Sequence, residues 1–152
     1  GFALCLIMAA YYKAQGKTLI DVMNGLYDEF GYYCNTVQSY TFEGASGMEK
    51  MAAIMDGLRV NKPSSFAGYE VTKIDDYKTS KSTDVKTGEE SEITLPKSNV
   101  LAYTLTDGNK VIVRPSGTEP KIKAYITAIG TSEENAKQIA QELLKDADEL
   151  MK

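Results

Sequence analysis

The first thirty residues carry apolar side chains in two runs with helical spacing. The run from Phe2 to Tyr12 is apolar on nearly every side, and Gly16 follows it where a left-handed cap would end a helix. Thr18 and Asp21 then resemble a capping box, and Gly31 closes the second run. The apolar residues of that second run are Leu19, Ile20, Met23, Leu26, Tyr27 and Phe30. The pattern predicts two helices, the first of which needs burial on all sides.

The pattern changes after Gly31. Tyrosines, threonines and Val37 indicate an extended segment over residues 32–42, and small and polar residues interrupt the chain over residues 43–47. We place the linker and the domain boundary at this interruption. Apolar residues then return at helical spacing and predict a third helix with a core-facing methionine stripe: Met48, Met51, Ala52, Met55 and Leu58.

The second half of the chain alternates apolar and polar side chains, as strands with one buried face do. Four such segments occur: residues 69–74, 100–106, 110–113 and 122–126. Asp107-Gly108 predicts a tight hairpin between two of them, because this pair supplies positive φ angles. The polar residues 75–99 indicate a solvated excursion or a polar hairpin. Thr131 and Glu134 offer a capping box for a final helix with one apolar side: Ala136, Ile139, Ala140, Leu143, Leu144, Ala147 and Leu150.

These elements predict an α+β fold. We expect an antiparallel four-stranded sheet with helices packed on one face, preceded by a helical remnant of a previous domain. Residues 1–42 would be the helical end of that domain plus the linker, and residues 43–152 the C-terminal domain. We therefore expect the chain to be a piece of a longer protein.

The composition limits the kinds of catalysis and binding that we expect of this chain. The 152 residues are 43% hydrophobic and 25% charged, which suits a packed domain. The sequence has no histidine and only two cysteines, so it lacks the commonest general base and cannot build a structural zinc site. The cysteines lack a framework spacing and indicate small buried side chains in a reducing cytoplasm. A net charge of -4 disfavours nucleic acid, and the longest apolar run falls short of the ~20 residues that span a bilayer.

The segment RPSGTEPK, which begins at Arg114, contains the groups that a phosphate dianion needs. Arg114 offers a planar fork of donors that stays ionised near neutral pH. Ser116 and Thr118 add hydroxyl donors, and Pro115 stiffens the same loop. Gly117 allows a ligand to approach the backbone N–H closely. The segment therefore predicts an anion site between two strands.

Cations gather around this segment. Residues 110–123 hold three lysines and Arg114 against Glu119, a net charge of +3, while the rest of the chain carries -7. A basic pocket in an acidic surround favours a small anion over a polyanion. An ordinary turn is the alternative, with the hydroxyls bonded to their own backbone and Arg114 paired with a carboxylate. Lys121 and Lys123 alternate as on a solvated strand face, so their contact with a ligand stays open.

RPSGTEPK resembles the phosphate-binding loop in the last domain of the α-D-phosphohexomutase superfamily, which includes the phosphoglucomutases and phosphomannomutases. The strings MAAYYKAQGKTL and EFGYY resemble the end of that superfamily's third domain, and LPKSNVLAYTL and KIKAYI its fourth. The resemblance is greatest to bacterial phosphoglucomutases. It implies that residues 1–42 end the third domain and that residues 43–152 are the C-terminal phosphate-binding domain.

The resemblance implies an isomerase that interconverts glucose 1-phosphate and glucose 6-phosphate by intramolecular phosphoryl transfer. Its last domain would hold the phosphate that is not being transferred, in either monophosphate or in the 1,6-bisphosphate. The matching substrate-phosphate positions are Arg114, Ser116, Gly117 and Thr118, with Pro115 in the same loop and Lys123 as a further candidate. We expect no catalytic residue and no metal ligand in these 152 residues.

The superfamily's phosphoserine, Mg²⁺ and glucose 1,6-bisphosphate would then belong to the full-length enzyme. We expect this chain alone to be inactive, to bind no cofactor, and to have a phosphosugar and the missing upstream domains as partners, with no nucleic acid and no membrane. Two alternatives remain open. The parent enzyme would be a phosphomannomutase, phosphoglucosamine mutase or phosphopentomutase, or the chain would be a stand-alone module that binds an anion or a nucleic acid.

Overall fold

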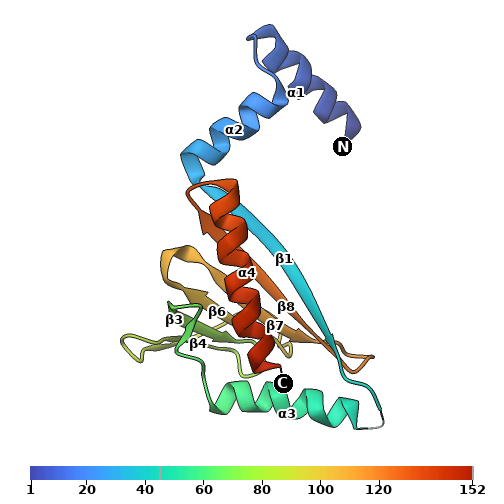
Figure 1. The fold of residues 1–152 in the computed structure, drawn as a ribbon, viewed down its shortest axis with the longest axis vertical. Coiled ribbons are helices and arrows are strands. Elements are labelled where there is room, and N and C mark those ends of the chain that lie inside the picture. The colour runs from blue at the N-terminus through green and yellow to red at the C-terminus, as the bar shows by residue number, and fades with distance from the viewer. Residues whose placement is uncertain (45, 152) are drawn as a thin grey trace.

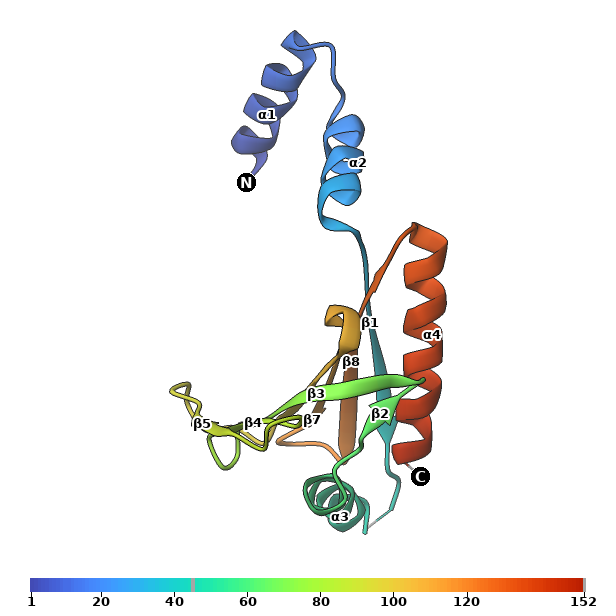
Figure 2. The same ribbon diagram turned by 90° about the vertical axis from the view of Figure 1, so that its left-hand side faces the viewer.

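The computed structural model describes residues 1–44 and 46–151. Two helices, α1 (Phe2–Ala14) and α2 (Leu19–Phe30), stand clear of a sheet that is packed with α3 (Gly47–Val60) and α4 (Glu133–Leu150) (Figures 1 and 2). The long strand β1 (Tyr32–Thr41) leads from α2 into the sheet. The predicted α+β class is correct.

The sheet is antiparallel, with the strand order β1-β8-β7-β6-β3-β4-β5 and with β2 paired to β3. The strands after β1 are β2 (Ser65–Phe66), β3 (Tyr69–Asp76), β4 (Lys81–Asp84), β5 (Glu90–Glu92), β6 (Leu101–Leu105), β7 (Lys110–Pro115) and β8 (Lys121–Gly130). The described residues form eight strands, and the predicted number of four was wrong. The extended segment before the expected linker is a paired strand, and the polar excursion contains the β4–β5 hairpin.

β1 pairs with β8 over ten positions, from Tyr32 opposite Gly130 to Thr41 opposite Lys121. The sheet therefore includes a strand from the residues that we assigned to the preceding domain. The boundary between residues 42 and 43 stays a prediction. β8 lies between β1 and β7, so the loop that joins β7 to β8 is anchored by two ladders.

One face of the sheet is buried beneath the helices. α4 packs along β8 and β1, and α3 also contacts β8. On the buried face of β8, alternate residues have almost no exposed surface: Ile122, Ala124, Ile126 and Ala128. The predicted apolar side of α4 faces this core, as do Met51, Met55 and Leu58 of α3. Two residues of the predicted stripe, Met48 and Ala52, are instead exposed, Met48 to 46% at the first turn of α3.

The helix ends and the tight turn follow local sequence chemistry. The Thr18 hydroxyl accepts from the Asp21 N–H while the Asp21 carboxylate accepts from the Thr18 N–H, which confirms the predicted capping box of α2. Asp107 and Gly108 both adopt positive φ between β6 and β7, which confirms the hairpin. At α4 the cap is Ser132, whose hydroxyl accepts from the Asn135 N–H, and not the predicted Thr131.

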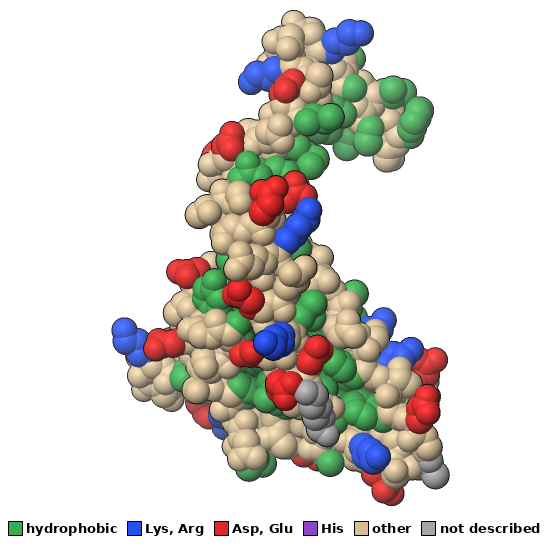
Figure 3. Space-filling view, viewed as in Figure 1, with side chains coloured by type: hydrophobic (Ala, Val, Ile, Leu, Met, Phe, Trp, Pro, Cys, Tyr) green, Lys and Arg blue, Asp and Glu red, His purple; other side chains and the backbone are tan. Residues whose placement is uncertain are grey.

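The helices α1 and α2 contain no buried residue. Figure 3 shows apolar side chains gathered on α1, where Phe2 is 80% and Ile7 65% exposed. Cys5 is exposed with them, so our expectation of a buried Cys5 was wrong, because the described part of the chain buries no residue of α1. Within residues 1–44 and 46–151, no helix has the length and apolar character needed to cross a membrane.

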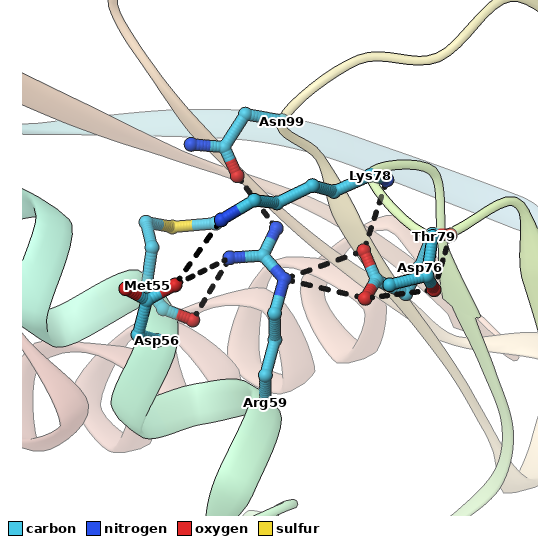
Figure 4. Close-up of polar contacts among 7 residues, drawn as sticks. All are labelled: Met55, Asp56, Arg59, Asp76, Lys78, Thr79 and Asn99. Carbon is cyan, nitrogen blue, oxygen red and sulfur yellow. Dashed lines mark hydrogen bonds and ion pairs between the residues drawn. The ribbon is translucent and has the colours of Figure 1, made fainter.

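A polar cluster fastens α3 to β3 (Figure 4). The Arg59 side chain is 14% exposed, and its Nε lies 3.3 Å from one carboxylate oxygen of Asp76 on β3. Its guanidinium also donates to the Met55 carbonyl at 3.1 Å and to the Asn99 side chain. Arg59 thus connects a helix, a strand and a loop on the helical side of the sheet.

Candidate phosphate-binding loop

The loop over residues 116–120 joins β7 to β8. The strands pair up to Pro115 opposite Ile122, which places Arg114 directly across from Lys123. The Ser116 N–H donates to the Lys121 carbonyl at 2.7 Å and closes the loop. Arg114 and Lys123 alternate with buried neighbours, so both project from the sheet face opposite α4.

Whether Arg114 has a carboxylate partner distinguishes an anion site from an ordinary turn in this segment. Arg114 is exposed, and in the part of the chain that the structure describes it has no hydrogen bond and no ion pair. The turn interpretation required a carboxylate partner for this guanidinium, and the described residues do not provide one. All five donors of the fork remain available to a ligand.

The Ser116 hydroxyl forms hydrogen bonds with the backbone of the loop. Its oxygen accepts from the Thr118 N–H at 3.4 Å and from the Glu119 N–H at 3.3 Å. This is the self-bonded turn that we considered as the alternative, and it leaves the hydroxyl proton of Ser116 free to be donated. The Thr118 side chain is exposed at the tip of the loop.

Gly117 is an exposed residue of the loop. A Cβ built on it would meet no atom within 4 Å, so the surface above the backbone is empty. Its φ is not in the left-handed region, so the positive φ that we allowed for is not used. Gly117 therefore contributes an exposed backbone that a ligand can approach.

Two charged residues of the segment are already engaged with each other. The Lys121 Nζ lies 3.0 Å from a Glu119 carboxylate oxygen. In this pair the negative charge of Glu119 partly offsets the attraction of Lys121 for an anion. Arg114 and Lys123 are left as the cations without a partner among the described residues of the loop and its flanking strands from 114 to 123.

The loop encloses a hollow of about 330 Å³. It is lined by the residues that sequence reasoning selected, with one addition: Arg114, Pro115, Ser116, Gly117, Thr118, Lys123 and Tyr125. Tyr125 was missed. The signal was present, because a residue two places after Lys123 lies on the same face of a strand.

The described residues, 1–44 and 46–151, contain no group of three or more Cys, Asp or Glu side chains that could hold a metal ion. They do not fit the Mg²⁺ that the superfamily resemblance implies for the whole enzyme. The loop itself offers an anion fixed hydrogen-bond donors and positive charge.

Comparison with known proteins places this loop in a family. The family model described as "Phosphoglucomutase/phosphomannomutase, C-terminal domain" matches residues 58–146. A phosphoglucomutase of Staphylococcus epidermidis is 39% identical over 124 residues, which cover 82% of this chain and 22% of that protein. A phosphoglucomutase of Staphylococcus haemolyticus is 37% identical over 131 residues, which cover 86% and 23%. The chain thus spans about a fifth of the length of these relatives.

Among solved structures, the open form of pp63/parafusin, a phosphoglucomutase from Paramecium, has a TM-score of 0.60 to this chain. The two are 14% identical, and the match covers 95% of this chain and 25% of the other. That likeness supports the fold. Because the family model covers more than half of the sequence, including the whole loop, the chain belongs to the phosphoglucomutase/phosphomannomutase family, as its C-terminal domain.

Proposed function

We propose that the loop holds a phosphate group of a phosphosugar, and that it does so as part of a longer phosphoglucomutase. The observation that carries the proposal is the exposed, unpartnered guanidinium of Arg114 beside the open backbone of Gly117. Ser116 and Thr118 border the same hollow with hydroxyl groups, and Lys123 adds a second cation. Donors from five residues then converge on one tetrahedral anion.

The loop would grip the phosphate that is not being transferred in glucose 1-phosphate, glucose 6-phosphate or the 1,6-bisphosphate. Binding energy at a remote phosphate orients the other end of the sugar for reaction. Interconverting the two monophosphates requires the loop to accept a phosphate on either C1 or C6. A site made of donors to phosphate, with few groups dedicated to the sugar, meets that requirement.

The remaining chemistry would belong to other parts of the enzyme. We assign the phosphoserine, Mg²⁺ and the reacting phosphate to upstream domains, and we expect the 152 residues alone to be inactive. The exposed apolar side chains of α1 and α2 support contact with those domains, because apolar patches of this kind mark interaction surfaces. The parent enzyme is assigned to the cytoplasm, with the linker after β1 as a hinge for substrate entry and release.

A phosphate titration of the ¹⁵N-labelled chain tests this proposal. Inorganic phosphate and glucose 6-phosphate should both move the Gly117 amide most, with dissociation constants of about 1 mM, equivalent to ~-4 kcal/mol. Arg114→Ala should weaken binding about 30-fold, because a hydrogen-bonded charge contributes about 2 kcal/mol. Lys145→Ala is the matched control, since it removes one cation from α4 on the other side of the sheet. Equal affinity in the Arg114 variant would contradict the proposal.

The choice of phosphosugar needs the whole enzyme. Assays of the full-length parent against glucose, mannose, glucosamine and pentose phosphates should show the highest kcat/KM for glucose phosphates. A higher value for another sugar would move the protein to a different mutase while leaving the role of the loop intact.

A further inference from the structure

The chain that leaves β1 is fastened to the last residue of the phosphate loop. β1 and β8 end their ladder with Thr41 opposite Lys121. One residue later, the Phe42 N–H donates to the Pro120 carbonyl at 2.9 Å. The Phe42 side chain is half-buried against the core. The loop is therefore held by the pairing of β7 with β8 and, at Pro120, by a further hydrogen bond from Phe42.

Gly47, the first residue of α3, is buried and lies against the Phe42 carbonyl group and the Pro120 side chain. A Cβ built on Gly47 would lie 2.2 Å from the Phe42 carbonyl oxygen and 2.9 Å from the Pro120 Cβ. The nearest atom is backbone, so no side-chain rotation would relieve the overlap. Three segments of the chain meet here at a distance that only glycine permits.

We infer that Gly47 is a positioning residue for the phosphate loop. It lets the start of α3 lie close against the Phe42 carbonyl and the Pro120 side chain, which fixes one end of the loop while residues 117–119 stay exposed. Any larger residue displaces the Phe42 carbonyl or the Pro120 side chain, and a shift of either residue disturbs the hydrogen bond from the Phe42 N–H to the Pro120 carbonyl. The inference rests on the proposed function, since it assigns Gly47 an effect on the anion that the loop binds.

The test compares two glycine substitutions in the same helix. Gly47→Ala introduces the overlap, whereas Gly57→Ala places its Cβ where no atom lies within 4 Å. Phosphate affinity is measured on the Gly117 amide at a temperature where both variants are folded by far-UV circular dichroism. Gly47→Ala should bind inorganic phosphate about 10-fold more weakly, because small misplacement of binding groups is costly. Gly57→Ala should stay within about twofold of the unaltered chain.

A purely structural role for Gly47 would lower the unfolding midpoint and leave the affinity of the folded protein unchanged. Equal phosphate affinity in the two alanine variants would therefore overturn the inference. If Gly47→Ala fails to fold, hydrogen exchange of the Phe42 amide in the unaltered chain decides. Saturating phosphate should slow that exchange several-fold, because binding and the Phe42–Pro120 bond stabilise the same loop position. An unchanged exchange rate would overturn the inference.

These outcomes separate the two proposals. Binding that depends on Arg114 but is the same in both glycine variants contradicts only the role of Gly47. Absence of phosphate binding in the unaltered chain, or binding that ignores Arg114, contradicts the proposed function and this inference with it.

Discussion

The two arginines of the chain, Arg59 and Arg114, lie in opposite environments. Arg59 is largely buried between α3 and β3, where Asp76, Asn99 and the Met55 carbonyl accept hydrogen bonds from its guanidinium. Arg114 projects from the open face of the sheet with no partner among the described residues. The fold therefore engages the guanidinium of Arg59 in hydrogen bonds and leaves the guanidinium of Arg114 accessible to a ligand.

The difference separates stability from binding. A buried cation whose partners come from three segments holds those segments together, and its removal leaves a carboxylate without a counterion. An exposed cation beside an open glycine adds little to folding, because solvent already satisfies it. The comparison predicts that the two arginines affect different measurements.

The largest effect should follow Arg59→Ala. We expect a loss of about 3 kcal/mol in the free energy of unfolding, because Asp76, whose side chain is 16% exposed, would lose its cation. Urea unfolding followed by circular dichroism measures it. Lys81→Ala is the control, since its pair with Glu90 is more than half exposed on the lysine side and should contribute less than about 0.5 kcal/mol. Similar losses in both variants would contradict the structural role of Arg59.

A smaller gain should follow Tyr103→Phe, beside the Arg59 cluster. The Tyr103 hydroxyl is buried and has no hydrogen-bond partner within residues 1–44 and 46–151. Removing it should stabilise the fold by about 1 kcal/mol, because an unsatisfied buried group disfavours folding. A loss of stability in urea unfolding would show that the hydroxyl has a partner.

The burial of Tyr103 also predicts that the stability of the fold depends on pH. Burial raises the pKa of Tyr103 above its ordinary value of 10.0, and burial together with the Asp148 carboxylate raises the pKa of Tyr40. The folded chain then keeps protons that the unfolded chain loses, so stability should be full below pH 10 and fall as pH rises above it. Tyr103→Phe should show a shallower fall in the unfolding midpoint. An identical slope would contradict the assignment.

The smallest effects should be those of the two lysines of the loop on phosphate affinity. Lys123→Ala should weaken phosphate binding about fourfold, equivalent to about 0.8 kcal/mol, because an exposed cation contributes modestly. Lys121→Ala should change affinity less, since its Nζ is held by Glu119. Titration of the Gly117 amide measures both, and a larger effect at Lys121 would reverse the roles that we give them.

Much of the fold follows from local chemistry in the sequence. Apolar spacing predicted α2, α3 and α4, and Asp107-Gly108 predicted the hairpin, because each signal lies within a few residues. The pairing of β1 with β8 joins residues about ninety positions apart, so no local pattern revealed it. The β4–β5 hairpin was uncertain for a different reason, since its strands bury little apolar surface.

The loop residues could also be selected from the sequence, since Arg114, Ser116, Gly117 and Thr118 have side chains suited to an anion. Whether these residues have partners in the folded chain could not be predicted from the sequence. Whether Arg114 was paired depended on where every carboxylate of the fold came to lie. Tyr125 joined the hollow, and Gly47 approached Pro120, through strand register and helix placement that only the assembled structure provides.

We propose that Arg114, which has no partner among the described residues, serves phosphate binding and contributes little to folding. The most direct test measures unfolding free energy and phosphate affinity side by side in Arg114→Ala. We expect the free energy of unfolding to stay within about 0.5 kcal/mol of the unaltered chain while the dissociation constant for phosphate rises about 30-fold. Unchanged affinity, or a loss of stability comparable to that of Arg59→Ala, would contradict it.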